Sequence, residues 1–208
     1  ASSSSVYGLN KKTPFSEDDN VDHPLSIYAA SKKSNELMAH SYSYLYDLPS
    51  TGLRFFTVYG PWGRPDMALF LFTKAAIENK TIRVNNYGDH ARDFTYVDDI
   101  VSGINKIIPL PPKKDNLIQP SPSQSKAPWQ ILNIGRGQKV QLMEFIEIIE
   151  EYFGKEIKKE FVPLQAGDVA NTFCDTTKLK EGFNYDPQVS VKEGVKKFLD
   201  WYVGYYKP

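Results

Sequence analysis

The segment Tyr28-Ala29-Ala30-Ser31-Lys32 places a phenol and an ammonium group four residues apart. In a helix, this spacing puts both side chains on one face. A tyrosine normally loses its proton only near pH ~10, but a neighbouring cation favours the phenolate, so such a pair can act as a general base near neutral pH. Because tyrosines and lysines are frequent in this chain, the same spacing can also arise by chance.

A run of four serines at positions 2 to 5 lies upstream, with Ser3 25 residues before Tyr28. We expect residues 2–7 to be the end of a buried strand that turns into a loop, where a hydroxyl could hydrogen-bond the oxygen whose proton Tyr28 removes. Serine runs are most often linkers, but a Val-Tyr-Gly segment follows at once, which is not linker composition. Ser3, Tyr28 and Lys32 are therefore the candidate catalytic residues.

The elements that must position these residues alternate between strands and helices, which predicts α/β architecture. We expect residues 1–60 to hold the last strands and the catalytic helix of a Rossmann-type parallel sheet, and residues 61–208 to form a smaller α/β substrate-binding region. Residues 109–128 contain six prolines, which is typical of a mobile surface insertion. Ser26 can cap a helix that Pro49 and Gly52 end. The expected strands are 53–59, 81–85, 93–96, 130–134 and 160–162; the other expected helices are 68–79, 98–108, 142–153, 177–182 and 191–205.

Composition excludes several classes of function. The 25 basic and 25 acidic residues give zero net charge, so no basic surplus indicates a nucleic-acid partner. No apolar run approaches the ~20 residues of a membrane span. A single cysteine, Cys174, is expected to be a small buried residue and suits a reducing, cytoplasmic compartment. The three histidines have no metal-ligand spacing, so we expect no metal site.

Several ordered motifs resemble the extended short-chain dehydrogenase/reductases that act on nucleotide sugars. The first is Ser-x-x-Val-Tyr-Gly followed by Tyr-x-x-x-Lys. The others, in order, are Leu-Arg-Phe-Phe with Tyr-Gly-Pro within 53–61, Arg-Asp-Phe-Thr-Tyr at 92–96, Leu-Asn-Ile-Gly at 132–135 and Gly-Asp-Val at 167–169. The resemblance covers essentially the whole chain, and it implies NAD as the cofactor and a UDP-sugar as the substrate.

The resemblance also assigns roles to individual residues. It implies that Tyr28 and Lys32 contact the cofactor together with Phe55 and Phe56, whose strand closes over the nicotinamide. The residues that it implies for the substrate are Ser5, Thr57, Arg64, Val84, Asn85, Arg92 and Asp168. Among these, Arg92 would pair with the diphosphate and Asp168 with the ribose. Taken alone, Thr57 could equally be an ordinary strand residue, Arg64 an exposed turn residue, and Arg92 part of a surface ion pair with Asp93.

Two features favour one member of the superfamily, the UDP-glucuronate 4-epimerases. Sugar-nucleotide 4,6-dehydratases carry Asp-Glu before the Val-Tyr-Gly segment, whereas this chain has Ser4 and Ser5. The segment 60–68 is similar to that of UDP-glucuronate 4-epimerases, in which the arginine, here Arg64, faces the sugar carboxylate. A guanidinium suits this role because it holds a carboxylate through two parallel hydrogen bonds. UDP-galactose 4-epimerases have an arginine where this chain has Gln165.

The expected reaction is NAD-dependent 4-epimerisation of UDP-glucuronate to UDP-galacturonate through a 4-keto intermediate. The alternatives are a UDP-galactose or UDP-N-acetylhexosamine 4-epimerase, and a non-catalytic remnant. The chain has no Gly-rich phosphate-binding loop, so we expect its N-terminal NAD-binding part to be missing and these residues alone to be inactive. A complementary N-terminal half is therefore a possible partner. The resemblance also implies a homodimer formed through the Tyr28 helix and its neighbour.

Overall fold

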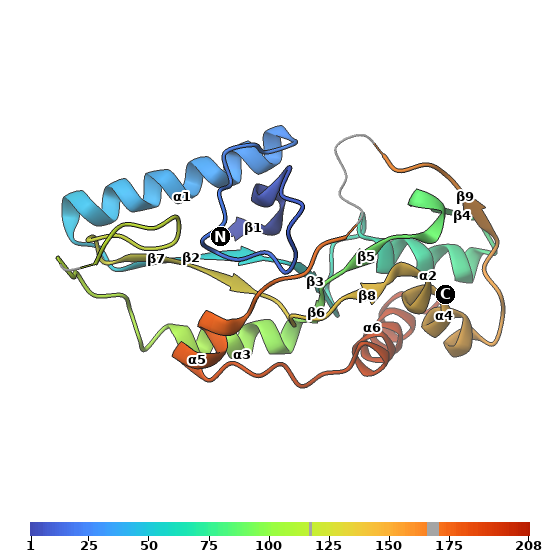
Figure 1. Cartoon of the computed structure of the whole chain (residues 1–208). Coiled ribbons are helices and arrows are strands. Elements are labelled where there is room, and N and C mark those ends of the chain that lie inside the picture. Colours follow the sequence, from blue (N-terminus) through green and yellow to red (C-terminus); the bar gives the residue numbers. More distant parts are fainter. Residues whose placement is uncertain (117, 166–170) are drawn as a thin grey trace.

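The computed structural model describes residues 1–116, 118–165 and 171–208, and it has two lobes (Figure 1). The first lobe contains a parallel sheet in the order β1-β2-β7, formed by β1 (Ser2–Ser3), β2 (Ser50–Phe55) and β7 (Trp129–Ile134). Helix α1 (Ile27–Tyr46) covers one face, and α3 (Val97–Ile107) and α5 (Thr177–Phe183) lie on the other. This arrangement confirms the predicted α/β class with a Rossmann-type parallel sheet.

The second lobe combines short strand pairs with three long helices (Figure 1). The helices are α2 (Ala68–Glu78), α4 (Leu142–Phe153) and α6 (Val191–Tyr206). The parallel pairs are β3 (Thr57–Tyr59) with β6 (Phe94–Tyr96), and β4 (Ile82–Val84) with β9 (Lys159–Phe161). The antiparallel pair is β5 (Ala91–Arg92) with β8 (Val140–Gln141), and two 3₁₀ turns are η1 (Ser4–Tyr7) and η2 (Asn85–Gly88).

The expected strand 53–59 is two strands that belong to different sheets. The backbone N–H of Phe56 donates to the carbonyl of Ile134 on β7 (3.1 Å), but the next N–H, of Thr57, donates to the carbonyl of Asp93 beside β6 (3.0 Å). The run of aromatic and β-branched residues predicted extended backbone correctly. The same run of residues does not indicate where the chain stops pairing with β7 and begins to pair with β6.

The expected boundary at residue 60 does not separate the two sheets. Strand β7 lies in the range 129–134, far beyond that boundary, and pairs with β2 along its whole length. Helices α3 and α5 also pack against the first sheet, where Ile100 and Leu179 share a buried cluster with Leu132. The chain therefore crosses from the first lobe to the second and back, so the lobes are not consecutive in the sequence.

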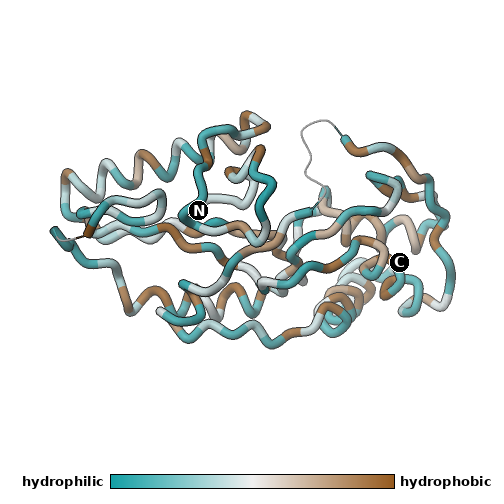
Figure 2. The backbone as a smooth tube through the Cα atoms, in the orientation of Figure 1, coloured by the Kyte–Doolittle hydropathy of each residue, from teal (hydrophilic) through white to brown (hydrophobic). Residues whose placement is uncertain are grey.

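Helix α1 begins as predicted: the Ser26 hydroxyl caps it by accepting from the backbone N–H of Ala29 (3.1 Å). Its contact with the sheet is narrow, because only Ala29, Glu36 and Ser43 are buried in the whole helix. These residues are seven apart and share one face. Most of the helix is exposed, including large apolar side chains: Ile27, Leu37, Met38, Tyr42, Tyr44, Leu45 and Tyr46. In Figure 2 its tube alternates between hydrophilic and hydrophobic segments.

A buried ion pair joins α1 to the sheet. The guanidinium of Arg54, on β2, is fully buried and donates to both carboxylate oxygens of Glu36 (2.9 and 3.0 Å). The hydroxyl of Ser2, on β1, donates to the same carboxylate (2.6 Å), and Arg54 also donates to the Tyr7 hydroxyl (3.2 Å). The Tyr7 hydroxyl in turn donates to the side-chain oxygen of Asn133 on β7 (2.6 Å). This network connects α1, η1 and all the strands of the sheet.

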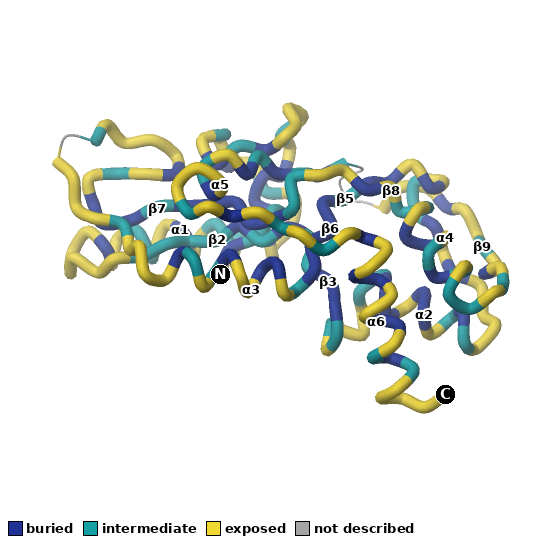
Figure 3. The backbone as a smooth tube through the Cα atoms, turned by 90° about the horizontal axis from the view of Figure 1, so that it is seen from below, coloured by how far each residue is buried: buried dark blue, intermediate teal, exposed yellow. Residues whose placement is uncertain are grey.

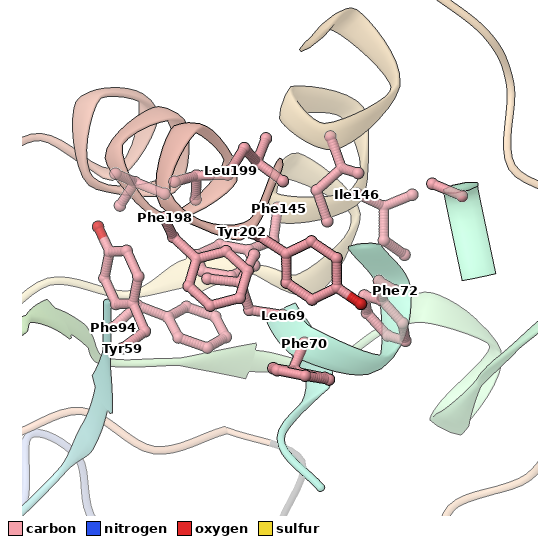
Figure 4. Packing of buried hydrophobic residues seen from close by; sticks show 14 of the residues in the cluster. Tyr59, Leu69, Phe70, Phe72, Phe94, Phe145, Ile146, Phe198, Leu199 and Tyr202 are labelled. Atoms are coloured by element: carbon pink, nitrogen blue, oxygen red, sulfur yellow. The ribbon is translucent and has the colours of Figure 1, made fainter. Parts of the chain in front are cut away.

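The core of the second lobe is aromatic. Tyr59, Phe94 and Phe145 lie against one another between the strands and α4, with the Phe94 and Phe145 rings stacked at 4.2 Å between centroids. Phe198 and Tyr202 bring α6 onto this cluster (Figure 4). The aromatic residues Phe198 and Tyr202 of the last helix are therefore core residues. The C-terminal end of the helix is exposed (Figure 3).

The Pro-rich segment 109–128 was expected to be mobile surface chain, and its second half makes specific contacts with the first lobe. Ser123 is fully buried, and its carbonyl accepts from the backbone N–H of Ile131 on β7 (2.8 Å). Its hydroxyl donates to Asp18 (2.5 Å) and accepts from Lys178 (2.7 Å). Proline content removes hydrogen-bond donors, but the serines between the prolines supply the contacts that fix this half on the sheet.

We expect Glu36→Gln to destabilise the protein by about 3 kcal/mol, because it leaves the buried Arg54 charge without its partner. The measurement is urea unfolding, with Glu151→Gln as the control. Glu151 forms an exposed ion pair with Lys192, so its loss should cost about 1 kcal/mol or less. Equal losses of unfolding free energy in the two variants would show that the buried pair stabilises the protein no more than an exposed one.

The same pair predicts a pH dependence. Burial acts to raise the pKa of Glu36, but the hydrogen bond and charge of Arg54 outweigh it and lower the pKa below its usual value. The stabilisation is therefore present above the ordinary carboxyl pKa and is lost as the pH falls through the lowered, folded value. Glu36→Gln should flatten this part of the curve of unfolding free energy against pH.

Candidate functional site

The serine loop is held in a tight turn at the end of β1. The Ser3 hydroxyl oxygen accepts from the backbone N–H (3.2 Å) and the hydroxyl (2.9 Å) of Ser5. Gly8 ends the turn with a φ of +51°, and a Cβ there would lie 2.0 Å from the carbonyl oxygen of His23. Only glycine fits this position, so the geometry of the turn requires the glycine of the Val-Tyr-Gly segment.

Tyr28 and Lys32 lie together on the first turns of α1. The Lys32 ammonium is 5.8 Å from the centroid of the Tyr28 ring, and it donates to the carbonyl of Ala1, next to β1 (3.2 Å). The Tyr28 side chain is 53% exposed. The phenol is thus open to a ligand and has a cation beside it, as the four-residue spacing predicted.

Two neighbouring cavities are present: a large one lined by the second lobe, and a small one between the serine loop, the residues just before α1 and the second lobe. The large cavity, of about 420 Å³, is lined by Thr57, Arg64, Asn85 and Arg92 among other residues. The small cavity, of about 140 Å³, is lined by Ser5 together with Leu25 and Ser26 at the start of α1. Both cavities share Thr57 and Arg92. Five of the predicted substrate residues therefore line two adjoining cavities: Ser5, Thr57, Arg64, Asn85 and Arg92.

Ser3 and Tyr28 do not line either cavity, but neighbours in the sequence do: Ser4 and Ser5 beside Ser3, and Ser26 two residues before Tyr28. No hydrogen bond joins Ser3 and Tyr28 in the described part of the chain. Their closeness to a common ligand therefore stays a prediction.

Arg64 lines the large cavity and already has a carboxylate partner. Its Nε donates to Oδ1 of Asp66 (3.0 Å), and its Nη2 donates to Oδ2 of the same residue. The hydrogen bond and the charge of Asp66 raise the pKa of Arg64, and the nearby Tyr28 phenol acts in the same direction.

Arg92 and Asp93 have separate roles. Asp93 is fully buried, and its carboxylate accepts from the backbone N–H groups of Arg136 (2.8 Å) and Gly137 (2.9 Å). It also accepts from the Cys174 thiol (3.1 Å). Burial, followed by the charge of Asp93, raises the pKa of Cys174 well above its ordinary value, so the thiol is a buried donor. A surface ion pair between Arg92 and Asp93, the alternative considered above, is wrong because Asp93 is not at the surface.

Besides Tyr28 and Lys32, three predicted contact residues do not line either cavity. Val84 is completely buried in the core of the second lobe, and its carbonyl accepts from the N–H of Val162 (3.0 Å). Phe56 is buried against Tyr7, and Phe55 packs against the α3 side of the sheet. Strand alternation sends the side chain of Val84 to the core and that of Arg83 to the cavity, whereas Asn85, which also lines the cavity, begins η2 after the strand ends. Asp168 and the rest of the Gly-Asp-Val motif lie outside the described residues.

Other cavity residues were not identified in the sequence as contacts. His90 and Arg83 line the large cavity, as does Gln165, which the sequence analysis noted only as a departure from galactose epimerases. In the sequence, the position of His90 two residues before Arg92 could have indicated that it lies near the same ligand. The buried Arg54–Glu36 pair was also missed, although a charged residue in the middle of an apolar strand could have indicated it.

Among the residues that the structure describes, no group of three or more His, Cys, Asp and Glu side chains is placed to bind a metal ion. The same residues include no helix with the length and apolar character needed to cross a membrane.

A family model described as GDP-mannose 4,6 dehydratase matches residues 1–198. The chain belongs to this family of NAD-dependent nucleotide-sugar epimerases and dehydratases. It is 56% identical over 210 residues to Protein CapI of Staphylococcus aureus, a match that covers 100% of this chain and 63% of that protein. It is 46% identical to a probable UDP-glucuronate 4-epimerase of Rhizobium meliloti, covering 100% of this chain and 62% of that protein.

Solved structures of the family agree with the fold. A UDP-glucuronic acid 4-epimerase from Bacillus cereus, in complex with UDP-glucuronic acid and NAD, superposes with a TM-score of 0.82 at 34% identity. That match covers 96% of this chain and 59% of the Bacillus cereus chain. The present chain thus spans about three fifths of the length of these family members.

The contrast between Val84 and Asn85 gives a prediction. Val84→Ala should lower the free energy of unfolding by on the order of 2 kcal/mol, because it opens a hole in the core. Asn85→Ala should change it by only about 0.5 kcal/mol, because the Asn85 side chain faces the cavity. Chemical denaturation of both variants checks this, and similar losses would show that the two positions are not divided between core and cavity.

Proposed function

We propose that these residues form the substrate-binding and proton-transfer part of an NAD-dependent UDP-sugar 4-epimerase that interconverts UDP-glucuronate and UDP-galacturonate. The observation that carries the proposal is the large cavity, which brings together Thr57, Arg64 and Arg92. The exposed Tyr28, with Lys32 beside it, follows two residues after Ser26, which lines the adjoining small cavity. The names of the Rhizobium meliloti relative and the Bacillus cereus structure support the choice of sugar. The relatives are longer, so the proposal concerns these residues joined to a dinucleotide-binding part.

NAD, when bound, would supply the acceptance and return of a hydride at C4 of the sugar. The residues of this chain that fit it are Tyr28, which is exposed, and Lys32, which is half-buried and donates to the carbonyl of Ala1 just before β1. Ligands of open parallel sheets bind beyond the carboxyl ends of the strands, and β1 ends at the serine loop. Phe55 and Phe56 are proposed only to shape the sheet beneath the cofactor, since neither lines a cavity.

In the proposed reaction, Tyr28 removes the proton of the C4 hydroxyl, while Ser3 hydrogen-bonds the same oxygen. Lys32 keeps a positive charge beside the phenol, which favours its action as a base. The resulting 4-keto sugar turns in the large cavity and presents its other face, and Tyr28 then returns the proton to the C4 oxygen. The serine loop offers hydroxyl groups and no carboxylate, so it lacks an acid/base for eliminating water.

The sugar carboxylate is the group that distinguishes this substrate from neutral UDP-hexoses. A 4-keto uronate is a β-keto acid, which loses CO₂ readily. We propose that Arg64 holds the carboxylate through two hydrogen bonds while the ring turns, that Arg92 pairs with the diphosphate, and that Asn85 lies near the base. Ser5 and Thr57 would add hydroxyl contacts, and Asp168 is retained as the proposed ribose contact.

Tyr28→Phe should lower kcat by about 10²-fold or more, because it removes the group that transfers the proton, with little change in the affinity for UDP-glucuronate. The measurement is the interconversion of UDP-glucuronate and UDP-galacturonate by the complete protein, followed by chromatography. Tyr42→Phe is the matched control, because Tyr42 is another exposed tyrosine of α1. Full activity of Tyr28→Phe would refute the mechanism.

The same assay with UDP-galactose and UDP-N-acetylglucosamine separates the alternatives. Faster turnover of either neutral sugar would replace the glucuronate proposal by one of these epimerases. Lack of turnover of every UDP-sugar by a complete, NAD-loaded protein would favour a non-catalytic role.

We also propose that the complete protein dimerises through α1. The exposed apolar side chains of this helix support the proposal, since such a surface is usually covered by another chain or domain. Leu37→Glu should convert the dimer to monomer in light scattering coupled to gel filtration, whereas Leu110→Glu, at an equally exposed site outside α1, should not. A dimer that survives Leu37→Glu and similar changes along α1 would contradict this interface.

A further inference from the structure

The loop between β3 and α2 carries its own carboxylate partner for Arg64. Arg64 and Asp66 are two residues apart, both line the large cavity, and they form a two-point contact through Nε and Nη2 of the guanidinium. A guanidinium makes the same two-point contact with any carboxylate, whether it belongs to a side chain or to a ligand. The contact that Arg64 would make with a sugar carboxylate is therefore already occupied by Asp66.

The pair can be opened at little cost. The Arg64 side chain is 72% exposed and the Asp66 side chain 63%, and exposed ion pairs are weak because water and salt compete with them. Asp66 also has an alternative location. The next residue, Met67, is the N-cap of helix α2, and its side chain makes no capping hydrogen bond. The free N–H groups of that first turn favour a nearby carboxylate.

We propose that Asp66 is a specificity-determining residue, which occupies Arg64 as an internal carboxylate until the carboxylate of a bound ligand displaces it. This inference rests on the function proposed above, in which Arg64 faces the sugar. A neutral sugar leaves the Arg64–Asp66 pair intact and gains no contact from the guanidinium. The carboxylate of a uronate takes the place of the Asp66 carboxylate on Arg64, so only an anionic sugar can displace Asp66.

The test is equilibrium binding of UDP-glucuronate and UDP-glucose to the complete protein by titration calorimetry. Asp66→Asn keeps the size of the side chain but removes its charge, so it should raise the affinity for UDP-glucuronate by about two- to five-fold. The affinity for UDP-glucose should not change. In an Arg64→Ala background, Asp66→Asn should have no effect on either ligand. Glu181→Gln, at an exposed position of α5 outside the cavity, controls for the change in net charge.

Three results would overturn the inference. An unchanged or weaker affinity of Asp66→Asn for UDP-glucuronate would mean that Asp66 does not compete with the ligand. An equal gain for UDP-glucose, or for Glu181→Gln, would mean that the effect is one of overall charge. An effect of Asp66→Asn that persists without Arg64 would mean that the pair is not its cause.

Failure of the proposed function would look different. If the wild-type protein binds UDP-glucuronate no better than UDP-glucose, and Arg64→Ala changes neither, the carboxylate role of Arg64 fails and this inference with it. If the wild type prefers UDP-glucuronate through Arg64 but Asp66→Asn has no effect, only the inference about Asp66 fails.

Discussion

The buried ion pair between Arg54 and Glu36 fixes the position of α1 relative to the sheet, and the candidate site depends on it. Helix α1 contacts the sheet through a narrow face on which Glu36 is the central residue. A charge pair in this position is tolerated only when its hydrogen bonds are complete, and Ser2 and Tyr7 help to complete them. Because Ser2 precedes the serine loop and Glu36 lies two turns beyond Tyr28, one network positions both sides of the proposed catalytic group.

A second buried carboxylate, Asp93, holds the two lobes together where the chain passes between them. Its side chain accepts from the loop after β7 and from Cys174, while its own carbonyl accepts from Thr57, the first residue of β3. Thr57, which makes this hydrogen bond, and Arg92, which precedes Asp93, line both cavities. Both residues were expected to bind substrate. The motif that signals a ligand site in the sequence thus combines a structural residue, Asp93, with a neighbour that reaches the cavity.

The residues proposed to select the sugar lie in one short loop, whereas the core that supports this loop is built from distant parts of the chain. The loop that carries Arg64 and Asp66 is short and exposed, and it can change its contacts without moving the core below it. Behind it, Tyr59 and Phe94 belong to an aromatic cluster that reaches α4 and α6. In the mechanism proposed above, the sugar preference would depend on this loop and the proton transfer on the Tyr28–Lys32 pair of α1.

The elements and the chemistry of short segments can be predicted from the amino-acid sequence. The helix capped by Ser26, the strands rich in aromatic residues and the Tyr28–Lys32 spacing all depend on neighbours within a few residues, and local propensities suffice to predict them. The family resemblance added the list of contact residues, five of which line the cavities. Only the tertiary structure decided which strands pair, that β7 returns to the first sheet, that Val84 is buried while Asn85 is not, and that Ser123 is fixed by Asp18. Each of these depends on hydrogen bonds and packing between residues far apart in the chain, and a linear pattern of residue types does not encode which distant group will supply the partner.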